Sequence, residues 1–139
     1  MAFWSTKRIG ALVMCGAVLV LASCGSREDE PAGFATHRLL EPREFAAAVG
    51  EPARVTINVH VPYEGNIPGT DLSIPFDQIG QQAAKLPADR DTPLAIYCRS
   101  GPMSAEAAAE LSSLGYTNVV ELQGGMRSWQ SAGFPLTDG

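Results

Sequence analysis

Three short apolar runs separated by helix-forming segments most strongly limit the fold of this chain. The runs are RVTINV (54–59), LAIYC (94–98) and TNVVEL (117–122), each rich in residues that favour strands. A helical pattern over 44–49, with Pro42 near its first turn, lies upstream of them. Because strands alternate with helices at short spacing, the sequence predicts an α/β domain with a mainly parallel sheet flanked by helices.

The segments around these runs complete the expected secondary structure. Alanine-rich stretches, glycine stops and turn residues set their boundaries. The further expected elements are extended segments over 37–40 and 73–76, a helix capped by Asp77 that runs to about Lys85, a helix over 104–114 capped by Ser104, and a helix over 126–132.

The N-terminal segment has the form of an export signal. Lys7 and Arg8 precede an uncharged apolar run over 9–22, which is shorter than the roughly 20 residues of a membrane-spanning helix. The run ends in Leu-Ala-Ser-Cys-Gly, which resembles the bacterial lipobox, whose cysteine is lipidated and becomes the new N-terminus. We therefore expect residues 1–23 to be a lipoprotein signal peptide and Cys24 to be lipidated. An ordinary cleaved signal and an uncleaved anchor are the alternatives.

The segment after Cys24 is rich in charge, glycine and proline and shows no periodicity. We expect residues 24–35 to be a flexible tether and residues 36–139 to be the folded domain. The 15 acidic and 10 basic residues argue against nucleic acid as a partner and against electrostatic binding to a membrane. The expected location is therefore extracytoplasmic, with the protein anchored to a bacterial membrane through the lipid on Cys24.

The chain contains three cysteines, and only one of them falls in the expected domain. Cys15 would leave with the signal peptide and Cys24 would be blocked by its thioether, so Cys98 has no partner for an intradomain disulfide. A lone thiol in an oxidising compartment is either an inert core residue or a reactive group. Two histidines and one thiol show no metal-ligand spacing, so no metal is expected.

The position of Cys98 favours a reactive thiol. It ends the 94–98 strand, and ligands of parallel sheets bind beyond the carboxyl ends of the strands. The loop after it leads to a helix N-terminus, which favours anions such as a thiolate. Gly101 allows the backbone to curl round the sulfur, while Arg99 and Ser100 add donors. A cysteine phosphatase needs an arginine six positions after the cysteine, but Ser104 stands there, which argues against phosphate chemistry.

Three ordered motifs in this chain resemble those of the single-domain rhodanese family of sulfurtransferases. They are VTINVHVPYEGNIPGTDLSIPF, YCRSGPMS and LQGGMRSWQSAGFPL. The resemblance implies a three-layer α/β sandwich and no cofactor. It also implies that Cys98 carries sulfane sulfur as a persulfide and that Arg99 helps to bind an anionic donor. The loop that would hold the persulfide comprises Arg99, Ser100, Gly101, Pro102, Met103 and Ser104.

Four residues depart from the family pattern. Asn58 stands where the family usually has Asp, His60 where it has Arg, Asn66 where it has His, and Met103 where this type of loop often has Arg. Asn58 and His60 are candidates for a supporting role behind the loop. Because positions 60 and 103 lack the arginine of the family pattern, we expect sulfur donors of low charge, such as persulfides, to be preferred over thiosulfate.

Two functions are consistent with these motifs. The first is a membrane-anchored sulfurtransferase that takes sulfur from a small anionic or persulfide donor and passes it to cyanide, a thiol or a partner protein. The second is a non-catalytic rhodanese-like module that binds a partner protein, which the replacements at Asn58, His60 and Met103 would allow. Redox sensing is a third possibility, but the domain lacks a resolving cysteine.

Overall fold

The computed structural model describes residues 37–138. The expected signal peptide, the lipidation site at Cys24 and the tether lie outside this range. No helix in the described part is long and apolar enough to span a bilayer.

The centre of the domain is a parallel sheet of five strands in the order β1-β5-β4-β2-β3. This confirms the predicted fold class. Every residue of β4 and β5 is buried, because the sheet is covered on both faces and its central strands meet no solvent. The strands are β1 (Arg38–Leu40), β2 (Val55–Asn58), β3 (Leu72–Ser73), β4 (Leu94–Tyr97) and β5 (Val119–Leu122).

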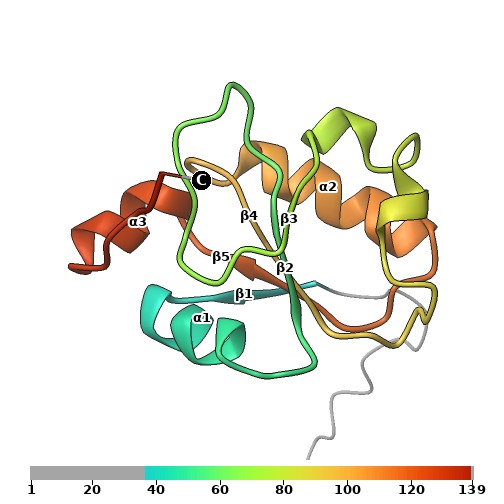
Figure 1. Cartoon of the computed structure of the whole chain (residues 1–139), viewed down its shortest axis with the longest axis horizontal. Coiled ribbons are helices and arrows are strands. Elements are labelled where there is room, and N and C mark those ends of the chain that lie inside the picture. Colours follow the sequence, from blue (N-terminus) through green and yellow to red (C-terminus); the bar gives the residue numbers. More distant parts are fainter. Residues whose placement is uncertain (1–36, 139) are drawn as a thin grey trace, which may run out of the picture. The chain divides into compact units, whose positions relative to one another are not determined.

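Helices cover the two faces of the sheet and form two hydrophobic clusters with it (Figure 1). On one face, Leu111 of α2 (Pro102–Ser113) packs with Ile96 of β4. On the other face, α1 (Pro42–Val49) and α3 (Gly125–Ser131) contribute Phe45 and Trp129, whose rings meet edge to face. Trp129 is thus a core residue, with 4% of its surface exposed.

The segment after β3 differs from the prediction. Two short 3₁₀ helices, Phe76–Gln78 and Ala83–Lys85, replace the single helix expected from Asp77 to Lys85, and Asp77 makes no capping hydrogen bond. Gly80 interrupts the helical pattern, and a β-carbon there would lie 2.6 Å from the Glu110 carboxylate. Glycine in the middle of a helix is unfavourable, so the segment divides into two short helices on either side of Gly80.

The helix after the cysteine loop also begins earlier than predicted. Its N-cap is Gly101 and its first residue is Pro102, which needs no donor at that position. Ser104 is therefore not the cap, and it lies fully buried in the first turn instead.

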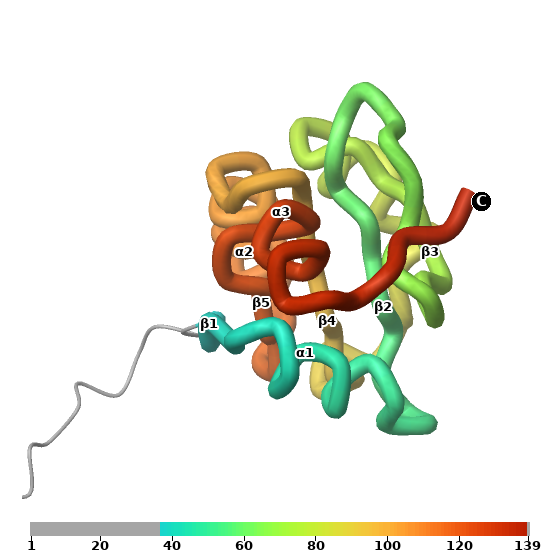
Figure 2. The backbone as a smooth tube through the Cα atoms, turned by 90° about the vertical axis from the view of Figure 1, so that its left-hand side faces the viewer, coloured from blue at the N-terminus to red at the C-terminus, as the bar shows by residue number. Residues whose placement is uncertain are grey.

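The C-terminal segment returns across the domain to the loop after β2 (Figure 2). Thr137 and Asn66 exchange backbone hydrogen bonds of 2.8 Å in both directions. The loop over 60–70 is thereby tied down beside the carboxyl end of β4, where the cysteine lies.

Candidate functional site

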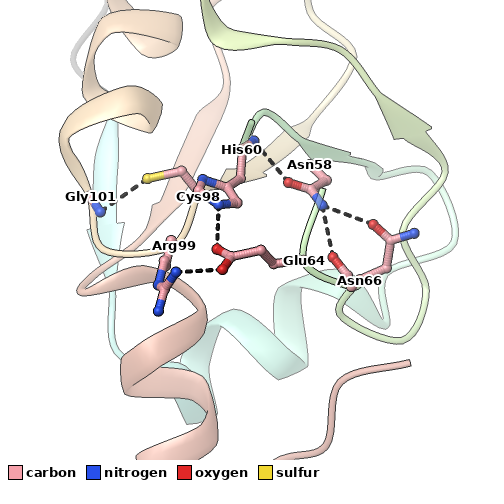
Figure 3. A network of polar contacts seen from close by, with 8 residues as sticks. Asn58, His60, Glu64, Asn66, Cys98, Arg99 and Gly101 are labelled. Carbon is pink, nitrogen blue, oxygen red and sulfur yellow. Dashed lines mark hydrogen bonds and ion pairs between the residues drawn. The ribbon is translucent and has the colours of Figure 1, made fainter. Parts of the chain in front are cut away.

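Cys98 follows the last residue of β4 and lies at the carboxyl edge of the sheet. Its side chain is buried, with 1% of the residue exposed. The Gly101 N–H donates to the sulfur over 3.0 Å (Figure 3). Gly101 has φ of 123°, a conformation that residues with a β-carbon rarely adopt, so glycine is needed for the loop to turn back on the sulfur.

The first turn of α2 faces the same sulfur. Pro102 has no N–H, and the amides of Met103 and Ser104 have no carbonyl partner within the helix, as in the first turn of any helix. Such amides and the helix dipole favour a thiolate or an added anionic sulfur. Ser100, by contrast, is exposed on the loop, and the Met103 side chain packs partly buried against the core cluster beneath α2.

The start of α3 holds the cysteine loop in place. The Met126 N–H donates to the Cys98 carbonyl over 2.9 Å, and the Arg127 N–H donates to the Arg99 carbonyl over 3.0 Å. A β-carbon on Gly125 would lie 2.5 Å from the Cys98 carbonyl oxygen. The second glycine of the Gly124-Gly125 pair therefore allows α3 to approach the loop backbone.

Arg99 is engaged by an acidic residue that the sequence did not single out. Its guanidinium pairs with Oε1 of Glu64, and Oε2 of the same carboxylate lies 2.6 Å from Nε2 of His60 (Figure 3). The hydrogen bond from His60, together with the positive charge of Arg99, holds the pKa of Glu64 below its ordinary value despite some desolvation. The cation expected to bind a donor is thus already paired.

Asn58 organises the loop on the other side of the site. Its amide Nδ2 donates to the Gly65 carbonyl over 3.0 Å and to Oδ1 of Asn66 over 2.9 Å. Its Oδ1 accepts the His60 N–H over 2.9 Å. An amide can donate and accept at once, whereas the ionised Asp usual in the family can only accept. Asn58 therefore stabilises the conformation of the loop.

A second buried contact lies behind the cysteine. Ser104 Oγ is 3.4 Å from the Cys98 sulfur and donates to Oε1 of Glu121 over 2.5 Å. Oε2 of Glu121 lies 2.9 Å from Nε2 of His37, in a contact that is not an aligned hydrogen bond and that is an ion pair when the imidazole is protonated. The sequence pattern identifies neither His37 nor Glu121 as a neighbour of the cysteine loop.

A cavity of about 150 Å³ opens beside the loop, between Arg99 and the first turns of α3. Charged groups at its wall include Glu64 and Arg127. Within residues 37–138, no cluster of three or more His, Cys, Asp or Glu side chains could hold a metal ion.

Comparison with known proteins identifies the family. A model of the rhodanese-like domain matches residues 42–132. The chain belongs to the rhodanese-like family. This rhodanese-like domain is 37% identical over 83 residues to a sulfurtransferase of Allochromatium vinosum, covering 58% of this chain and 75% of that protein. It is 32% identical over 90 residues to a thiosulfate sulfurtransferase of Pseudomonas fluorescens, covering 65% of this chain and 83% of the relative.

Other rhodanese-like relatives resemble this chain over part of their length. A probable adenylyltransferase/sulfurtransferase of Mycobacterium tuberculosis is 36% identical over 111 residues, which span 76% of this chain but 28% of that protein. Among solved structures, a rhodanese-related protein of Thermoplasma volcanium superposes with a TM-score of 0.61 at 28% identity, covering 73% of this chain and 98% of that one. Sulfurtransferases are thus among the relatives of this rhodanese-like domain.

Proposed function

We propose that this domain is a sulfurtransferase that carries sulfane sulfur as a persulfide on Cys98. The observation that carries the proposal is the single thiol of the domain placed against the Gly101 N–H and the first turn of α2. A thiolate there attacks the outer sulfur of a donor such as thiosulfate or an alkyl persulfide. The new S–S bond forms as the donor's S–S bond breaks, and the electron pair leaves with sulfite or with the donor thiolate. No external oxidant is needed.

In the second half-reaction an acceptor removes the sulfur. Cyanide, a thiolate or a cysteine of a partner protein attacks the outer sulfur of the persulfide, and the Cys98 thiolate leaves. The site carries one negative charge before and after each transfer, on Sγ of the thiolate and on the outer sulfur of the persulfide. The Gly101 N–H donates to Sγ, and the free amides of the first turn of α2 are donors available to the outer sulfur.

Donors of low charge fit this site better than thiosulfate. The Arg99 charge is matched by Glu64, so a dianion would have to displace that carboxylate or share the cation with it. Met103 provides no charge where the family loop often has arginine. We therefore expect alkyl persulfides to be the preferred donors.

Steady-state transfer by the full chain tests this function. The assay compares the wild-type chain with Cys98→Ser, using thiosulfate or an alkyl persulfide as donor and cyanide as acceptor. We expect thiocyanate formation that depends on Cys98 and a higher kcat/KM for the persulfide. Equal rates for the wild-type chain and Cys98→Ser, with either donor, would contradict the proposal.

The second candidate function is a partner-binding module without turnover, and the near-complete burial of Cys98 favours it. In that case Cys98→Ser would keep the biological phenotype of the wild type, whereas a phenotype equal to that of a deletion would reject the module.

We also propose that Cys24 carries a lipid that holds the domain at the outer face of a bacterial membrane. The proposal is supported by the charged and apolar segments before Cys24 and by the short tether after it. Labelling with a fatty-acid analogue tests it. We expect label on the wild-type chain and none on Cys24→Ala, while label on both or on neither would refute it.

A further inference from the structure

Glu121 is the most unusual residue of the described core. It is 2% exposed and lies on β5, in the middle of the sheet, where its neighbours in the chain are apolar. A carboxylate removed from water is costly unless it is paired or hydrogen-bonded. Its partners are Ser104 and His37, and Ser104 also touches the Cys98 sulfur. The buried carboxyl group is therefore one hydroxyl away from the reactive thiol.

The hydroxyl of Ser104 has a single proton and three possible acceptors. Glu121 Oε1 lies at 2.5 Å, the Gly101 carbonyl at 2.9 Å and the Cys98 sulfur at 3.4 Å. When Glu121 is ionised, the short, charge-assisted bond to the carboxylate is the strongest of the three. The lone pairs of Ser104 Oγ then face the thiol and can accept its proton.

We propose that Glu121 accepts the proton of the Cys98 thiol through Ser104, so that the thiol and the buried carboxyl group share one proton. The proton passes from Sγ to Ser104 Oγ as the hydroxyl proton passes from Oγ to Glu121 Oε1. The products are a thiolate and a neutral carboxylic acid, and the number of protons is unchanged. Glu121 acts through Ser104 and is therefore a positioning residue.

The benefit of this exchange is that the buried site keeps one negative charge. A thiolate or persulfide beside an ionised Glu121 would place two like charges out of water, which is unfavourable. With the proton on Glu121, Ser104 is free to donate to the sulfur. When the sulfur has been passed on, the proton returns to Cys98. The purpose of the exchange rests on the proposed function, but the exchange itself does not require a sulfur donor.

The other charged groups around Glu121 define what can influence this equilibrium. Among residues 37–138, His37 is the one titratable side chain in direct contact with the Glu121 carboxylate, and Cys98 reaches it only through Ser104. His37 precedes β1, and its side chain is 35% exposed. The remaining charged residues of the elements packed on β5 are exposed to solvent: Arg38 on β1, Arg43 and Glu44 on α1, and Glu106 and Glu110 on α2. His37 in its charged form stabilises the ionised carboxylate.

The test is the pH dependence of the thiolate absorbance of Cys98 in the full chain, measured as the difference from Cys98→Ser. Two groups that share a proton titrate as a pair, so the wild-type absorbance should rise in two steps separated by a plateau. Glu121→Gln should lose the low-pH step and leave a single rise. His37→Gln should move the low-pH step to higher pH, because the imidazolium no longer favours the carboxylate.

Ser104→Ala keeps the carboxyl group but removes its short hydrogen bond, which stabilises the ionised carboxylate more than it stabilises the thiolate, so the thiolate absorbance at the plateau should rise. This variant decides the matter if Glu121→Gln fails to fold. Glu106→Gln and Ser113→Ala, two exposed positions on the same helix, are the matched controls and should keep both steps. A single rise in the wild-type chain, or a plateau of unchanged height in Ser104→Ala, would overturn the proposal. Either result leaves the persulfide function standing, because the measurement contains no sulfur donor.

Discussion

Replacement of Gly125 by alanine tests whether the contact between α3 and the cysteine loop defines the site. The new β-carbon would lie 2.5 Å from the Cys98 carbonyl oxygen and from the Arg99 carbonyl carbon. Ordinary contacts between such atoms are about 3.5 Å or longer, so the loop backbone has to move. The atoms that must shift belong to the backbone of the loop itself, and no flexible side chain can absorb the clash.

The cost has two parts. Gly125 has φ of 62°, and a residue with a β-carbon in this left-handed conformation loses about 1 kcal/mol. Overpacking against a rigid backbone adds about 2 to 3 kcal/mol. The sum of about 3 to 4 kcal/mol is a large part of the roughly 5 to 15 kcal/mol that holds a domain of this kind folded.

Gly133→Ala is the matched control. Gly133 also has positive φ, at 88°, but no atom lies within 4 Å of the position of its β-carbon. This variant should lose only the backbone term of about 1 kcal/mol. Urea unfolding of the full chain measures both losses, and donor-dependent persulfide formation should fall in Gly125→Ala alone. Equal losses of stability in the two variants, with equal persulfide yields, would show that the contact of α3 with the loop does not define the site.

Three further predictions concern the polar groups around the loop. Glu64→Gln should free Arg99 and lower the KM for thiosulfate. In the wild-type chain the KM should fall only as the pH drops through the lowered pKa of Glu64, because the carboxylate stays ionised and paired with Arg99 above that pKa. A KM for thiosulfate that does not change with pH in the wild type would contradict this prediction. Met103→Arg should raise kcat/KM for thiosulfate, while kcat/KM for an alkyl persulfide should stay within about threefold of the wild-type value. An equal rise for both donors would show that the added charge is not the cause. Asn58→Asp restores the usual family residue, but its carboxylate would face the Gly65 carbonyl and Oδ1 of Asn66, so the free energy of unfolding should fall by about 3 kcal/mol. Unchanged urea unfolding would show that the hydrogen bonds of Asn58 do not stabilise the domain.

The sequence predicted the sheet well because its central strands are apolar at nearly every position. LAIYC and TNVVEL correspond to β4 and β5, whose residues are all buried. The helix expected after Asp77 was wrong. Gly80 lies between the two short 3₁₀ helices that replace it, and glycine in the middle of a helix is unfavourable. Ser104 as a cap was wrong because Gly101 and Pro102 already begin the helix.

The sequence predicted the cysteine loop of the candidate site but not the two acidic residues that contact it, Glu64 and Glu121. Cys98 and Gly101 are adjacent in sequence to the strand and helix that place them, so local pattern was sufficient. Glu64 and Glu121 meet Arg99 and Ser104 only through the fold, at separations of 35 and 17 residues. A carboxylate inside an apolar strand was the one available signal for Glu121, since such a residue needs a partner when both faces of the sheet are covered.

The mass of the full chain after treatment with a sulfur donor shows whether Cys98 carries sulfane sulfur. Peptide mapping should show one added sulfur atom on the peptide that contains Cys98, removable by cyanide, with an alkyl persulfide giving more than thiosulfate. The same treatment of Cys98→Ser should leave that peptide unchanged. If Cys98 reacts with a thiol reagent before treatment and gains no sulfur from either donor, the domain does not carry sulfur on this residue and is not a persulfide carrier.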